Sequence, residues 1–284
     1  MSTKKNPDSS LKRIRASLRR RVRHLNRFSR RSLQFSLVLV GAGLVSLVSI
    51  GFAHLVDWGI KLNQQWVALA PWAVWIVIPC SLALLCWMTR RFAPFAAGSG
   101  IPQVIAAMSL PDDSGRGRLV SLAQALWKIP LTFLALIAGA SVGREGPSVQ
   151  VGAALMLAWG KCCRVLGVPL IHVQTSELIA TGAAGGLAAA FNAPLAGVIF
   201  AIEELGRGVS FKWQRMVLLG VLASGFIVVG LMGNNPYFGM FDTQAAHRQL
   251  IWGVVLAGGI CGVAAGFFSR LWAKGAAAFA PSRM

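Results

Sequence analysis

Three long stretches of this sequence contain no charged residue: Leu33–Ala53, Trp72–Met88 and Val217–Met232. A helix of about 20 apolar residues crosses the hydrocarbon core of a bilayer, and its backbone has to satisfy its own hydrogen bonds there. Each stretch is close to that length, and only 13% of the whole chain is charged. The sequence therefore predicts an all-α, polytopic membrane protein.

More than half of the formal net charge of +19 lies near the N-terminus, where residues 1–31 hold 12 Lys and Arg against one acid, Asp8. Apolar residues recur in this segment at helical spacing from Leu11 to Phe28. A basic amphipathic helix leading into a membrane span is typical of a cytoplasmic tail on anionic lipid headgroups. We expect residues 1–32 to form this tail, in a multi-pass protein of the cell (inner) membrane. Its N-terminus would be cytoplasmic, and we expect no nucleic-acid partner.

The motif most informative about function is Gly143-Arg144-Glu145-Gly146-Pro147, which places two charges in an apolar region. Proline suits the start of a helix because its missing N–H would have no partner there, so Pro147 is expected to begin a helix that reaches Lys161. A helix N-terminus attracts anions. Glu145 is then a tethered anion beside a place for a free anion, which predicts a gate that closes on ionisation and opens on protonation. A structural ion pair of Glu145, or a position at the membrane surface, is the alternative.

Two further breaks precede helices too short to span a membrane. Gly98-Ser99-Gly100-Ile101-Pro102 leads into an apolar piece ending at Leu110, and Phe191-Asn192-Ala193-Pro194 leads into one closed by Glu203-Glu204. Half-length helices opened by Gly and Pro are typical of re-entrant or broken segments. Taken alone, Ser99 could be a helix N-cap and the two glutamates a solvated pair. Residues 111–118 are expected to form a polar loop.

Small residues four positions apart predict close helix packing in two other segments. Ser176–Ala190 carries Gly182 and Gly186, and the final helix, from Gln249 to about Lys274, carries three more. Such faces let helix backbones approach each other inside a membrane. The five cysteines are scattered through apolar segments and are interpreted as small buried hydrophobes.

Together and in this order, the motifs resemble those of the CLC family of chloride channels and chloride/proton exchangers, over about residues 33–280. The resemblance implies anion transport, with chloride/proton antiport gated by Glu145 and proton transfer by Glu204. Family channels commonly have an apolar residue at the second glutamate, so a passive voltage- or pH-gated chloride channel is the alternative. The resemblance also implies a set of chloride-binding residues: Ser99, Gly100, Ile101 and Gly146.

The family likeness gives expected roles to other residues as well. Lys128 matches a lysine position on the helix before the gate motif and would raise the local positive potential, while Arg144 would attract anions as vestibule charge. Gln103 stands where many relatives have an acid. Chloride would be the substrate, with no metal or cofactor, and the resemblance implies a homodimer.

The family is built from two inverted repeats. The resemblance assigns residues 33–247 to the first repeat and residues 248–284 to the first helix of the second. The Gly-x-Phe-x-Pro motif expected later in the fold does not occur in these 284 residues. We therefore expect a truncated form of a transporter, with a non-transporting paralogue or assembly partner as the alternative.

An intramembrane serine hydrolase built on Ser99 is the competing function class. It requires a base within hydrogen-bond reach of the serine. The four histidines do not lie mid-span on a Gly-rich face, where such a base is expected. We therefore expect that the protein is not an enzyme.

Overall fold

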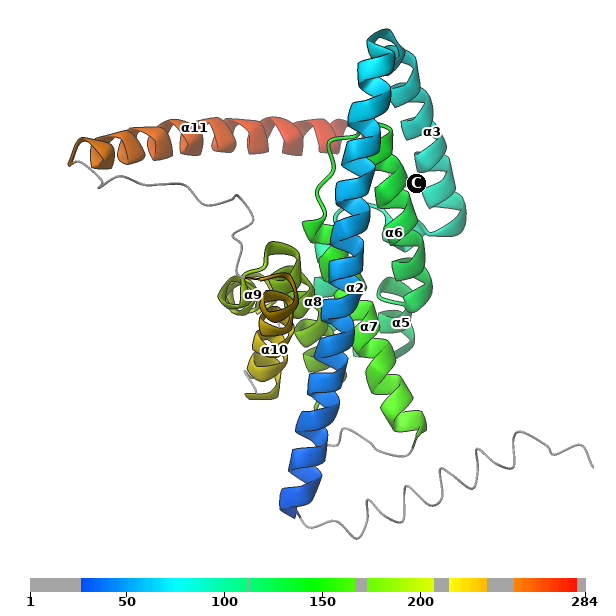
Figure 1. Ribbon diagram of the computed structural model, residues 1–284, viewed down its shortest axis with the longest axis vertical. Helices are drawn as coiled ribbons and strands as arrows, with labels where there is room; N and C mark the ends of the chain where they lie inside the picture. The colour runs from blue at the N-terminus through cyan, green and yellow to red at the C-terminus, as the bar shows by residue number, and fades with distance from the viewer. Residues whose placement is uncertain (1–26, 112, 167–172, 207–214, 234–247, 280–284) are drawn as a thin grey trace, which may run out of the picture. The chain divides into compact units, whose positions relative to one another are not determined.

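The computed structural model describes residues 27–111, 113–166, 173–206, 215–233 and 248–279, and its regular structure in these ranges is helical throughout (Figure 1). The chain divides into two compact units, residues 1–238 and 239–284. The helices of the first unit are α2 (Arg27–Leu69), η1 (Pro71–Ala73), α3 (Val74–Phe92), η2 (Pro94–Ala96), α4 (Ile101–Ser109), α5 (Asp113–Leu119), α6 (Leu122–Ile137), α7 (Glu145–Val165), α8 (Thr175–Phe191), α9 (Pro194–Phe200), the π-helical turn η3 (Ala201–Leu205) and α10 (Arg215–Met232). In the second unit the described residues form α11 (Arg248–Phe279).

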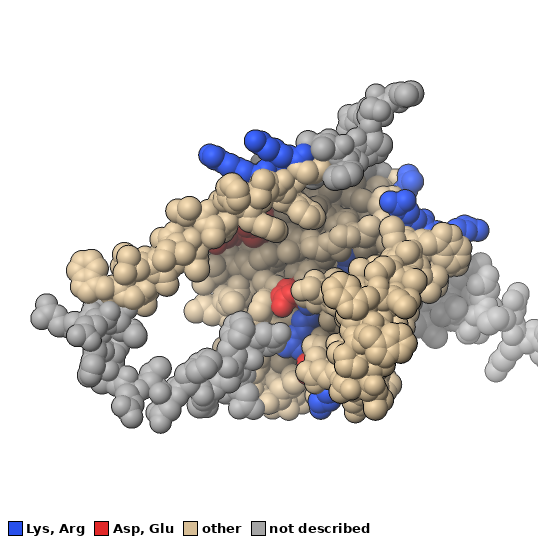
Figure 2. Space-filling view, turned by 90° about the horizontal axis from the view of Figure 1, so that it is seen from above, with Lys and Arg blue, Asp and Glu red and all other residues tan. Residues whose placement is uncertain are grey.

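Among the described residues, five helical segments are long and apolar enough to cross a membrane: Ser32–Leu69, Pro71–Phe92, Ser114–Ile137, Arg215–Met232 and Trp252–Gly275. Uncharged side chains cover most of the described surface in Figure 2. Such a surface suits a lipid environment, because lipid tails do not penalise exposed apolar side chains. The prediction of an all-α, polytopic membrane protein is confirmed.

The half-length helices also occur where the sequence predicts them. α4 has nine residues and α9 has seven, and each carries a proline in its first turn. Asn192 ends α8 in the left-handed conformation at φ 53°, which asparagine tolerates better than most residues. The chain therefore breaks at both predicted motifs.

The centre of the first unit is α8, whose residues are buried from Ser176 to Ala190 and which packs against α7. A Cβ at Gly182 would collide with the carbonyl oxygen of Gly152 on α7, and one at Gly186 would collide with that of Ser148. The small-residue face predicted on α8 is thus where the α7 backbone lies against it. This packing holds the N-terminal turn of α7 in place.

Two boundaries and most of the cysteines differ from the sequence-based expectations. The predicted polar loop contains α5, whose last turn carries Arg116 and Arg118, where cations stabilise a helix. α7 begins at Glu145 rather than Pro147, because the amide of Ser148 already donates to the Arg144 carbonyl oxygen. Pro147 is then the third residue, where a missing N–H still costs no intrahelical bond. The cysteine interpretation is right for Cys163, but other cysteines lie exposed on apolar helices: Cys80, Cys86 and Cys162.

Candidate functional site

The turn before α4 is built on two glycines in the left-handed region, Gly98 at φ 72° and Gly100 at φ 100°. Gly100 is the N-cap of α4, so the alternative role of Ser99 as the helix N-cap is wrong. The Ser99 Oγ accepts from the Ile101 amide at 3.4 Å, which is a long hydrogen bond. The Ser99 side chain is exposed, and its hydroxyl remains able to meet a ligand.

The N-terminus of α4 lies directly against the N-terminus of α7. A Cβ at Gly146 would collide with the Ser99 carbonyl oxygen, and one at Gly100 would lie 3.1 Å from the Gly146 carbonyl oxygen. Only glycine permits this approach, because any side chain would separate the two turns. The structure therefore brings together four residues that the sequence nominated as chloride ligands: Ser99, Gly100, Ile101 and Gly146.

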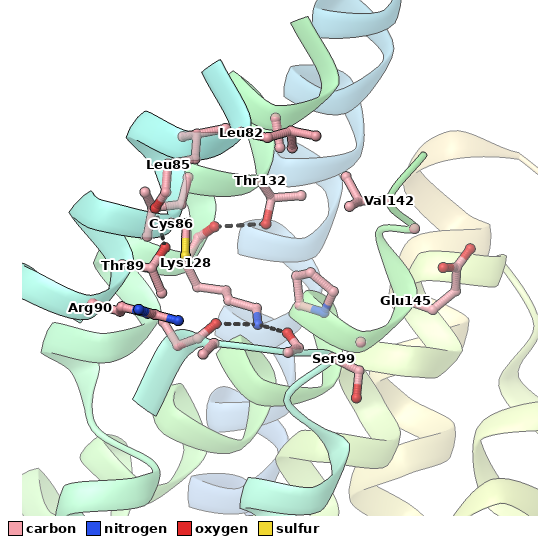
Figure 3. Close-up of a pocket in the computed structure, with 18 residues that line it drawn as sticks. Leu82, Leu85, Cys86, Thr89, Arg90, Ser99, Lys128, Thr132, Val142 and Glu145 are labelled. Atoms are coloured by element: carbon pink, nitrogen blue, oxygen red, sulfur yellow. Dashed lines mark hydrogen bonds between the residues drawn. The ribbon is translucent and has the colours of Figure 1, made fainter. Parts of the chain in front are cut away.

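Ser99 and Glu145 both line one open cavity of about 660 Å³, whose walls come from α3, the segment before α4, α6 and the start of α7 (Figure 3). Its walls combine apolar side chains such as Leu85 and Leu131 with the cations Arg90 and Lys128. A cavity with apolar walls, cations and two helix N-termini is chemically suited to a small anion. Sequence reasoning did not include Arg90 among the site residues.

Glu145 is the first residue of α7 and is half-buried. Figure 3 shows its carboxylate directed away from Ser99. It lies beside Gly143, where an added Cβ would collide with the Glu145 Oε2. Among the described residues Glu145 takes part in no ion pair, so the alternative of a structural ion pair for Glu145 gains no support.

Arg144 instead pairs with Asp57 on α2, with 3.5 Å between the Arg144 Nη1 and the Asp57 Oδ1. The Arg144 side chain is only 12% exposed, whereas that of Asp57 is 57% exposed. Arg144 was predicted to be vestibule charge; the structure adds an anionic partner, which reduces the field it presents to a free anion. The two residues lie 87 positions apart, so sequence spacing gave no sign of Asp57.

Lys128 lies in the middle of α6 and is 4% exposed. Its Nζ donates to the Ala96 carbonyl oxygen at 2.7 Å and also to that of Gly98 (Figure 3). A buried cation is costly unless hydrogen bonds satisfy it, and these two carbonyls do so. Beyond its predicted electrostatic role, Lys128 therefore ties α6 to the turn that carries Ser99.

Glu204 is half-buried in the π-helical turn η3, and its neighbour Glu203 is exposed. Neither glutamate lines the cavity that holds Glu145 and Ser99. A π-helical turn is rare and is often found at functional sites. The structure thus places the predicted gate and anion ligands together and the predicted proton-transfer residue apart from them.

Comparison with known proteins decides the family. A family model described as voltage gated chloride channel matches residues 81–283. The chain belongs to the CLC family. This membership confirms the resemblance seen in the motifs, and it excludes the serine-hydrolase interpretation of Ser99.

Curated relatives include the H(+)/Cl(-) exchange transporter ClcA of Vibrio vulnificus, which is 33% identical over 257 residues, covering 84% of this chain and 51% of the relative. ClcA of Vibrio parahaemolyticus is 32% identical over 267 residues, covering 87% of this chain and 54% of that protein. The chain thus spans about half the length of the curated relatives it matches.

Solved structures give the same fold. A slow cyanobacterial Cl-/H+ antiporter matches with a TM-score of 0.65 and 28% identity, over 84% of this chain and 56% of its own. A CLC-type fluoride/proton antiporter matches with a TM-score of 0.59 and 20% identity, over 87% of this chain and 58% of its own. At 20% identity the second match supports the fold alone.

Proposed function

We propose that the protein exchanges chloride for protons across a membrane, with Glu145 as the gate and the turns at Ser99 and Gly146 as part of the anion site. The observation that carries this proposal is the contact between the first turns of α4 and α7, with Glu145 as the first residue of α7. Chloride that leaves water needs replacement donors, and helix N-termini offer free amides and a positive dipole end. The curated relatives and the closer solved structure carry names of chloride/proton exchangers, which supports the same activity.

Glu145 gates the site because its carboxylate and a free anion are attracted to the same first turn of α7. The ionised side chain competes with chloride when it swings toward Gly146, and the protonated side chain does not. In the structure the Glu145 side chain lies beside Gly143, with its carboxylate directed away from Ser99 (Figure 3). Proton binding and anion binding are thereby coupled through one side chain.

Glu204 supplies the second proton site of this mechanism. A half-buried carboxylate at a rare helical turn can take up a proton from one side of the membrane and release it toward the transport path. We further propose a homodimer in the cell membrane, with its N-terminus cytoplasmic and the basic N-terminal segment on anionic headgroups.

Replacing Glu145 by Gln tests the gate in proteoliposomes that contain the protein as produced from its own gene. The amide mimics the protonated acid, so chloride efflux should continue and become independent of pH between about pH 4 and pH 8. Glu203→Gln is the matched control, because it neutralises an exposed acid outside the cavity and should retain the normal pH dependence. A Glu145→Gln profile that still follows the unmodified protein would contradict the gate.

Replacing Glu204 by Gln tests proton coupling. A side chain that cannot ionise cannot relay protons, so an imposed chloride gradient should no longer drive protons uphill, while chloride itself still moves. External pH and chloride efflux are recorded together in the same vesicles. Uphill proton movement at the normal ratio in this variant would remove Glu204 from the mechanism. If the unmodified protein moves chloride and no protons, it is a passive channel instead.

A further inference from the structure

Four consecutive carbonyl oxygens before the Ser99–Gly100 turn accept hydrogen bonds from side chains rather than from the backbone. Gln150 Nε2 donates to Phe95 at 2.9 Å, Lys128 Nζ donates to Ala96 and Gly98, and Gln103 Nε2 donates to Ala97 at 2.6 Å. The three donors, which we name the carbonyl clamp, come from three different helices: α7, α6 and α4. The clamp fixes the segment that leads into the anion site.

Gln150 does more than hold one end of this segment. The same Nε2 lies 3.3 Å from the carbonyl oxygen of Leu119, the last residue of α5. Phe95 precedes α4 and Leu119 follows it, so one amide group on α7 secures the chain on both sides of the nine-residue helix. A helix this short is marginal by itself, and its orientation depends on such anchors.

The Gln150 side chain also packs directly against Gly100. A Cβ at Gly100 would lie 2.8 Å from the Gln150 Cβ and 2.9 Å from its Oε1. Gln150 is completely buried, and in the described part of the chain its Oε1 has no hydrogen-bond partner. Burying a half-satisfied amide is unfavourable, and an apolar side chain would avoid that penalty if packing were the only requirement.

Carbonyl oxygens repel anions, so their direction matters at an anion site. Each of the four carbonyls is engaged by a donor of the clamp, and a carbonyl so engaged is not free to turn toward a bound anion. The first amides of α4, including that of Ile101 with its long hydrogen bond to the Ser99 Oγ, can then meet that anion. Gln103 fits this arrangement because its amide nitrogen donates, which an ionised acid at the same position could not do.

We propose that Gln150 and Gln103 are positioning residues for the anion site, setting the separation of the α4 and α7 first turns and thereby the discrimination among small monovalent anions. This inference rests on the proposed function. Neither residue lines the cavity, so both act through the segment 95–98 and the Gly100 turn rather than by touching the ion.

The test is isothermal titration of the detergent-solubilised protein, as produced from its own gene, with chloride, bromide and nitrate. Gln150→Leu should weaken chloride binding about tenfold and change the chloride-to-nitrate affinity ratio about threefold, because hydrogen bonds that set the geometry are lost. Ser224→Ala is the control: Ser224 is fully buried on α10 and donates to the Gly185 carbonyl oxygen at 3.1 Å, outside the cavity. It should reduce stability while leaving the affinity ratio unchanged.

Gln103→Leu, at a half-buried position, decides the question by the same criteria if Gln150→Leu does not fold. Chloride affinity and affinity ratio that stay within about twofold of the unmodified protein, in the folded variants, would overturn the inference and leave the proposed function intact. An unmodified protein that binds none of the three anions would overturn the proposed function, and the inference with it.

Discussion

Replacing Lys128 distinguishes two roles that one buried cation can have. If Lys128 acts through its charge, Lys128→Arg should work as well as lysine, because the charge is kept. If it acts by tying α6 to the Ser99 turn, arginine should fail, because a planar guanidinium cannot reproduce a point donor to two carbonyls in a packed site. Lys128→Met removes both the charge and the tie.

The structure gives the size of the expected effect. Lys128 makes two hydrogen bonds to carbonyl oxygens while 4% exposed. A hydrogen bond to a charged group contributes about 1.5–3 kcal/mol in water-soluble proteins, and side-chain bonds between membrane helices average about 0.6 kcal/mol. Losing the two bonds and leaving their carbonyls unsatisfied should together lower the free energy of unfolding of Lys128→Met by about 2–4 kcal/mol. The free energy of unfolding of Lys128→Arg should fall by about 1–3 kcal/mol, because the larger side chain overpacks the site.

Two measurements on each variant separate the roles. The free energy of unfolding is obtained from titration with sodium dodecyl sulfate in mixed micelles, and chloride affinity from calorimetry. We expect both Lys128 variants to lose stability and to bind chloride about tenfold more weakly. Lys161→Met, which removes an exposed lysine from α7, is the control and should change stability by less than about 0.5 kcal/mol. If Lys128→Arg keeps normal stability and chloride affinity while Lys128→Met loses affinity, Lys128 acts through its charge and not through its hydrogen bonds to the Ser99 turn.

Two glycine substitutions make further predictions. Gly146→Ala places a methyl group against the Ser99 carbonyl oxygen, so chloride affinity measured by calorimetry should fall about tenfold, with a stability loss of about 1–3 kcal/mol; unchanged affinity would mean that the two first turns need not touch. Gly182→Ala forces α8 away from the α7 backbone at Gly152 and should lower the free energy of unfolding by a similar amount. Gly230→Ala is its control, because nothing lies within 4 Å of a Cβ there; equal effects of the two alanines would contradict close packing of α7 and α8.

The parts of the fold that could be predicted from the sequence are those that leave a mark on residue type. Charge-free runs predict spans because lipid tolerates little else. The breaks before α4, with glycines and Pro102, and before α9, with Asn192 and Pro194, predict half-helices because Gly, Asn and Pro commonly end or interrupt a helix. Gly182 and Gly186 predicted a close partner for α8 without identifying α7 as that partner. The start of α7 was predicted two residues too late, because proline is compatible with every position of a first turn.

Only part of the site could be predicted from the sequence, for a related reason. Ser99, Gly100 and Gly146 could be nominated because their side chains, or the absence of one, are what the site requires. Asp57 could not, because an exposed acid on a long helix has many possible partners, and its ion pair with Arg144 joins residues that are distant in sequence. Nothing in the sequence around Arg90 indicated that it lines the cavity.

The carbonyl clamp shows why the remaining part could not be predicted. Its acceptors are backbone oxygens, which every residue has. The residue types of the segment 95–98 therefore do not show that its carbonyls accept hydrogen bonds from side chains. Its donors are visible, but each had an incomplete interpretation: Lys128 as a source of potential, Gln103 as a missing acid, and Gln150 as an unremarked helical residue. In an apolar helix a buried amide or ammonium has to find acceptors, and helix backbones have already used theirs. The acceptors that remain belong to helix ends and to irregular segments, and irregular backbone within membrane depth occurs where a cavity or pathway is built. A buried Gln or Lys between apolar helical residues therefore predicts a nearby irregular segment, and in this chain that segment is the one that carries Ser99.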